Sequence, residues 1–179
     1  MENHLRMSKI FFSLTIFFLI AGCGHATYSF FNNRKTNIHI VRMNGNRMAG
    51  GIYYVALDAQ RYEEGDKISF SLIIKYQGPL FINIDNKKPL VIIIDGQRNE
   101  LIGKGSQDHQ DIVFIGSVIE SAYYHDIKPS LIKKLAYAEN IVVEIHGSTN
   151  TLTRYFNEKN LSNFKEFYHE YVDTALSTH

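Results

Sequence analysis

The chain has 179 residues, with 19 lysines and arginines against 18 aspartates and glutamates, and a formal net charge of +1. A charge so close to zero argues against a nucleic-acid partner, because phosphate backbones are bound by strongly basic surfaces. The single cysteine excludes an intramolecular disulfide and a zinc site built from several thiolates, while the 45% of hydrophobic residues suffices for a buried core.

The first segment of the chain combines an apolar run, small residues and the cysteine. Residues 10–21 form the run, and Arg6 and Lys9 precede it. A helix that spans a bilayer needs about 20 residues, whereas an apolar core of roughly 7–15 residues is typical of a secretory signal. The run ends in Leu-Ile-Ala-Gly-Cys at positions 19–23. This ending resembles the lipobox of bacterial lipoproteins.

The resemblance implies a lipid anchor. Cys23 would receive a diacylglyceryl group, cleavage before it would remove residues 1–22 as a signal peptide, and the new amino group would be acylated. Two or more acyl chains hold a protein firmly on a bilayer, whereas one chain binds only marginally. Gly24 stands where lipoproteins retained at the inner membrane commonly carry Asp, which favours the outer membrane. The start codon, Met1 or Met7, and the alternative of an ordinary signal peptide with an accidental cysteine stay open.

Removal of residues 1–22 leaves 157 residues with 17 basic and 17 acidic side chains, the size of one domain. Residues 23–36 lack clean periodicity, so we expect the lipidated N-terminus and a tether there. Residues 37–179 are then expected to form a single domain. The aromatic side chains of the tether could instead dock on the domain, namely Tyr28, Phe30 and Phe31.

The first half of this domain is rich in strand patterns. The clearest one is at 67–76, where apolar and polar residues alternate and predict a sheet with one covered and one wet face. The Leu-Val-Ile-Ile-Ile run at 90–94 predicts a central strand that is covered on both sides. Asn44-Gly45 and Asp95-Gly96 are typical of tight hairpin turns, and the polar residues 103–111 predict a flexible loop. Further strands are predicted at 37–43, 52–58, 80–85, 98–102 and 112–120.

The second half changes to a mixed pattern. A helix is predicted at 131–139, because Pro129 suits the first turn of a helix and the apolar residues that follow recur at helical spacing. A hairpin follows at 141–156, and an aromatic-rich stripe predicts a second helix at 158–176. The sum is an α+β fold: a mainly antiparallel six- to eight-stranded sheet or sandwich, with a β-rich first half and then α-β-β-α.

One cluster before the first helix is a candidate binding site. Exposed aromatic residues are enriched at binding hot spots, and tyrosine, histidine and aspartate together suit recognition. The competing interpretation is a strand end whose tyrosines pack beneath the helix. The four residues of this candidate binding patch are Tyr123, Tyr124, His125 and Asp126.

Candidates for metal binding and catalysis are weaker. Two carboxylates and an imidazole in the predicted loop could bind a divalent cation, although a solvated loop between strands is the favoured interpretation; they are Asp108, His109 and Asp111. His39 and His146 lie on predicted strands, and the sequence does not show that they meet. No serine-hydrolase elbow, phosphate-binding loop or zinc-protease helix motif is present. An acid hydrolase could draw only on Glu120, Asp126 and Glu144.

These observations favour a non-enzymatic, membrane-anchored envelope lipoprotein that acts as a binding or assembly module and needs no cofactor. Its expected partners are the membrane, through lipid on Cys23, and a protein in the cell envelope. The alternatives are a periplasmic immunity-type protein, a small-ligand carrier and an anchored cell-wall hydrolase.

Overall fold

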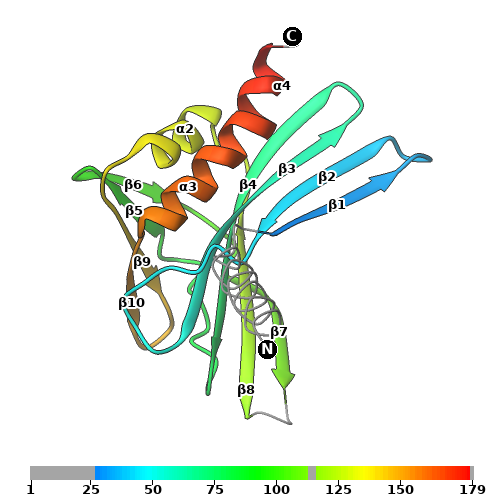
Figure 1. Cartoon of the computed structure of the whole chain (residues 1–179). Helices are drawn as coiled ribbons and strands as arrows, with labels where there is room; N and C mark the ends of the chain where they lie inside the picture. The colour runs from blue at the N-terminus through cyan, green and yellow to red at the C-terminus, as the bar shows by residue number, and fades with distance from the viewer. Residues whose placement is uncertain (1–26, 113–115, 178–179) are drawn as a thin grey trace, which may run out of the picture.

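The computed structural model describes residues 27–112 and 116–177 (Figure 1). Cys23 and the predicted signal peptide lie outside the described residues. Two antiparallel sheets make up most of the described chain. The larger sheet has the strand order β1 (Thr27–Asn33), β2 (Ile38–Asn44), β3 (Tyr54–Glu64), β4 (Lys67–Gly78), β8 (Ser117–Tyr124) and β7 (Ser106–Ile112). The smaller sheet has the order β10 (Thr151–Tyr155), β9 (Ile141–His146), β5 (Leu90–Ile94) and β6 (Gln97–Leu101).

Helices follow late in the chain, as the sequence predicts. Helix α2 spans Pro129–Tyr137, two residues earlier than expected, and α3 spans Glu158–Phe167. A π-helical turn, η2 (Tyr168–Asp173), and α4 (Thr174–Ser177) continue the last helix. The α+β, mainly antiparallel fold class is therefore confirmed. Within residues 27–112 and 116–177, no helix is both long and apolar enough to cross a membrane.

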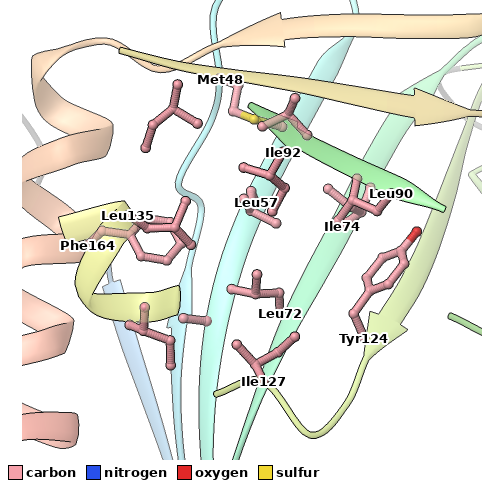
Figure 2. Close-up of a cluster of buried hydrophobic side chains, with 14 of the residues drawn as sticks. Met48, Leu57, Leu72, Ile74, Leu90, Ile92, Tyr124, Ile127, Leu135 and Phe164 are labelled. Atoms are coloured by element: carbon pink, nitrogen blue, oxygen red, sulfur yellow. The ribbon is translucent and has the colours of Figure 1, made fainter. Parts of the chain in front are cut away.

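The hydrophobic core lies between the six-stranded sheet on one side and the smaller sheet with the helices on the other (Figure 1). Leu57, Leu72 and Ile74 of the larger sheet point into it, because alternate residues of a strand share a face. Ile92 of β5 and Phe164 of α3 meet them from the opposite side (Figure 2). Burial of these apolar side chains is the main term that stabilises the fold.

Short-range signals predict the second sheet well. The β5–β6 hairpin turns at Asp95 and Gly96, which both have positive φ, at 47° and 80°. This pair of conformations suits the two-residue turns that match the twist of a hairpin. Strand β5 is central in its sheet, and Leu90, Val91 and Ile92 are buried, which confirms the expected two-sided cover.

Five local predictions fail or differ in their bounds. Residues 27–33, expected in the tether, form strand β1 at the edge of the larger sheet, fully paired with β2. Residues 106–112, mostly assigned to a loop, form β7, whose polar side chains suit an edge strand. The stretch 80–85 makes only an isolated bridge at Ile84. The Asn44-Gly45 pair starts a longer connection to β3 rather than a tight turn, and the strand predicted at 112–120 begins later, at Ser117.

Candidate functional site

The face of the six-stranded sheet opposite the core gathers polar side chains from five strands. The register places Arg42 of β2 beside Gln60 of β3, and Gln60 beside Ser71 of β4. In β8, Tyr123 lies on this face because its neighbours Ala122 and Tyr124 point into the core. We call this surface the polar face.

Direct contacts link the polar side chains into one cluster. The Arg42 Nε donates to Gln60 Oε1 over 2.8 Å, and the Arg42 guanidinium lies 5.8 Å from the centre of the Tyr123 ring. The Tyr123 hydroxyl donates to Asp108 Oδ2 over 3.0 Å. His125 stacks on Tyr123, with ring centres 6.2 Å apart and planes 8° apart, and its Nδ1 is 3.1 Å from Ser71 Oγ. The Tyr123 cluster therefore comprises Arg42, Gln60, Ser71, Asp108, Tyr123 and His125.

The cluster fixes the ionisation of Tyr123. Partial burial raises the pKa of this phenol, and its hydrogen bond to Asp108 raises it further, while the nearby Arg42 lowers it. The phenol therefore stays protonated at neutral pH and acts as a hydrogen-bond donor. His125 and Asp108 are exposed, Arg42 and Tyr123 are half-buried, and Gln60 is buried. The buried Gln60 therefore holds Arg42, one of the accessible side chains of the cluster, in position.

The Ser71–His125 pair resembles two parts of a hydrolytic triad but lacks the supporting arrangement. A catalytic histidine is normally oriented by a third group, and its serine is exposed to substrate. Here the His125 ring is held by stacking on Tyr123, and Ser71 is buried in the middle of β4. The contact fits a hydrogen bond that positions the imidazole.

The structure divides the candidate binding patch. Tyr123 and His125 belong to the Tyr123 cluster. Tyr124 packs in the core, as the competing interpretation expects, and burial raises its pKa to about 12 (Figure 2). Asp126 adopts a left-handed conformation, with φ 57°, in the connection to α2. Together with His125, it lines a groove of about 410 Å³ between β6 and α2.

The metal candidate is divided in the same way. Because β7 is a strand rather than a loop, Asp108 and His109 lie on opposite faces of the sheet. The His109 ring packs edge-on against Phe81, with centres 4.9 Å apart. The side chain of Asp111 lies outside the described part of the structure. Among the described residues, no group of three or more histidine, cysteine, aspartate or glutamate side chains could hold a metal ion.

The candidate hydrolase residues lie in different parts of the fold. Glu120 is fully buried on the core face of β8, and Asp126 lies in the connection to α2. Glu144 lies in the smaller sheet, where its Oε2 is 3.5 Å from Nη1 of Arg98. His39 and His146 are also in different sheets, and His146 contacts Thr151 instead. The structure thus brings none of these sets together.

Sequence reasoning misses Arg42, Gln60 and Ser71 as members of the site. The alternation of β4 already places Ser71 on the wet face. Arg42 and Gln60 join it only through the pairing of β2 with β3, which a single sequence does not reveal.

No protein-family model, curated protein or solved structure matches the chain. Its function is therefore inferred from the residues of the polar face together with the lipobox-like segment.

Proposed function

We propose that the protein is a bacterial envelope lipoprotein, anchored through Cys23, whose domain binds a partner protein through the polar face without catalysing a reaction. The observation that carries the binding function is the Tyr123 cluster. Tyrosine and arginine dominate binding hot spots, because they combine a large contact area with directional hydrogen bonds. Tyr123 and Arg42 are half-buried and prearranged by Gln60 and Asp108. Less side-chain entropy is then lost on binding.

The shape of the site favours a protein over a small ligand. Pockets for small molecules enclose most of their ligand in a concave, mainly apolar space. The accessible members of the Tyr123 cluster instead lie on β2, on β7 and at the end of β8, over the buried Gln60 and Ser71, and the two exposed members, Asp108 and His125, are polar. A broad polar surface of this kind suits a protein partner. A periplasmic immunity-type protein that neutralises a toxin is one form of this function.

The lipid anchor is supported by the sequence of residues 19–23, and Gly24 favours the outer membrane. Mass analysis of the amino-terminal peptide tests this part. We expect a mature chain that begins with an acylated Cys23. An unmodified Cys23 within an intact leader would contradict the anchor.

The binding face is tested by photo-crosslinking in cells, with a benzophenone amino acid replacing one tyrosine at a time. At Tyr123 we expect an adduct of one discrete mass, lost when Arg42→Ala is added. Tyr155 is the matched control, because it is an exposed tyrosine on β10 of the other sheet. Equal adducts at both positions, or none at Tyr123, would refute the assignment.

A further inference from the structure

The edge strand β1 carries two large exposed apolar side chains. Phe30 is 68% exposed and Phe31 is 55% exposed. The two residues are adjacent, so they project from opposite faces of the strand. Phe31 and Ile40 of β2 line a groove of about 360 Å³. A long, exposed and apolar edge strand is an aggregation hazard unless something covers it.

The proposed anchor lies very close to this strand. Cys23 is four residues before Thr27, the first residue of β1, and an extended chain of four residues reaches about 14 Å at most. Lipid on Cys23 would therefore hold the start of β1 beside the bilayer surface. The β1–β2 hairpin extends away from the smaller sheet, so its exposed edge is accessible (Figure 1).

The hairpin also lacks negative charge. Residues 27–44 contain Arg34, Lys35 and Arg42 but no aspartate or glutamate. Charge repulsion from anionic headgroups is therefore absent within the hairpin itself. Glu64, which pairs with Ile38 at the end of β3, and Glu166 and Glu170, which lie near Tyr28, weaken any attraction, so the apolar contact must carry most of the binding.

We propose that the β1–β2 hairpin is a second membrane contact, in which Phe30 and Phe31 insert into the interface of the bilayer that holds Cys23. Aromatic side chains of this kind bury their apolar part at the boundary between headgroups and acyl chains. The inference rests on the proposed lipid anchor. The alternative cover for β1 is a second copy of the chain that pairs edge to edge.

The chain contains no tryptophan, so a single introduced tryptophan reports its own position. The experiment uses the mature lipidated protein, which begins at Cys23, in vesicles of phosphatidylcholine with brominated acyl chains, which quench tryptophan at the membrane. We expect quenching and a blue-shifted emission for Phe31→Trp and for Phe30→Trp. Ile52→Trp is the control, because Ile52 is 84% exposed and lies in the connection between β2 and β3, away from β1.

The outcomes separate the two proposals. Variants that cosediment with vesicles but keep unquenched emission at positions 30 and 31 overturn the membrane contact and leave the anchor intact. Unquenched emission together with a concentration-dependent dimer replaces the membrane with a second copy. A lipidated chain that does not cosediment overturns both proposals. Equal quenching at position 52 also overturns the contact, because the bilayer then does not select β1.

Discussion

Four donors converge on the carboxylate of Glu120, which is fully buried on β8. Its Oε2 accepts from the backbone N–H groups of Ile82 and Asn83, at 2.9 and 3.1 Å. Its Oε1 accepts from the N–H of Ile84 at 2.6 Å and from the Ser106 hydroxyl. One side chain therefore accepts hydrogen bonds from three consecutive backbone N–H groups, at residues 82–84, in a stretch that lies outside both sheets apart from the isolated bridge at Ile84. A buried charge is tolerated only where it is bonded in this way.

Glu120→Gln should destabilise the protein strongly. The amide group of glutamine turns one acceptor oxygen into a donor, and on either side that donor would face backbone N–H groups. Unsatisfied buried donors and the loss of charged hydrogen bonds should together lower the free energy of unfolding by about 2–4 kcal/mol. Urea unfolding, followed by circular dichroism, measures the change.

Glu100→Gln is the control for this prediction. Glu100 lies on β6, its side chain is 51% exposed, and it pairs with Arg98 at 2.7 Å. A surface ion pair of this kind contributes at most about 1 kcal/mol. Equal unfolding midpoints for the two variants would show that Glu120 does not hold the 82–84 segment.

At the scale of elements, hydrogen bonds between buried amide side chains join α3 to the connection that follows β2. Asn157 and Asn160 form a capping box at the start of the helix. The Asn160 amide also donates to Asn46 Oδ1 and to the Arg47 carbonyl, both at 2.8 Å. Asn163 donates to the same Asn46 oxygen, at 2.9 Å. Asn46 thus joins the connection after β2 to two successive turns of α3.

This arrangement predicts coupling between Asn46 and Asn160. Asn46→Ala removes the shared acceptor and leaves buried amide donors without it, so we expect a loss of about 2–4 kcal/mol in the free energy of unfolding. In a double-mutant cycle with Asn160→Ala, the loss of unfolding free energy in the double variant should be smaller than the sum of the two single losses by about 0.5–3 kcal/mol. Asn32→Ala, at an exposed position on β1, is the matched control. Strict additivity would exclude a shared network.

Elements defined by local chemistry are predictable from this sequence. The alternation of β4, the Asp95-Gly96 turn, the β9–β10 hairpin and both helices follow from periodicity, turn residues and caps. The sequence does not predict strand β7, because an edge strand with a polar sequence gives no alternating apolar signal. Composition alone indicates a binding patch at residues 123–126, of which Tyr123 and His125 belong to the cluster.

The rest of the site depends on which strands pair. Arg42 and Asp108 are 66 positions apart in the sequence and reach Tyr123 from two different strands. Nothing local in either segment encodes that approach, because register arises from the fit of the whole core. The same reason explains why Glu120 resembled a catalytic acid in the sequence and proves to be bonded to backbone.

At the scale of the whole molecule, strand β1 sets the distance between the domain and the proposed anchor at Cys23. As a tether, residues 27–33 would let the domain move freely from the membrane. As a strand, they bind all along β2, and Tyr28 packs on Tyr171 with ring centres 5.3 Å apart. The domain then begins within a few residues of Cys23, and the proposed lipid on that residue would restrict the orientation of the domain on the membrane.

Deletion of β1 tests whether residues 27–33 act as a tether or as a strand of the domain. We compare unlipidated chains that begin at Gly24 and at Arg34. Loss of the β1 hydrogen bonds and of the Tyr28 contact should lower the free energy of unfolding by roughly 2–4 kcal/mol. The deletion also leaves β2 as a new exposed edge, which should make the shorter chain aggregate. Urea unfolding measures the first effect and light scattering the second. Tyr28→Ala in the longer chain should reproduce part of the destabilisation, because it removes a ring contact with Tyr171, whereas Asn32→Ala should not, because Asn32 is exposed. Equal stability and solubility of the two chains would show that residues 27–33 act as a tether. The proposal that the domain is held close to the bilayer would then fail.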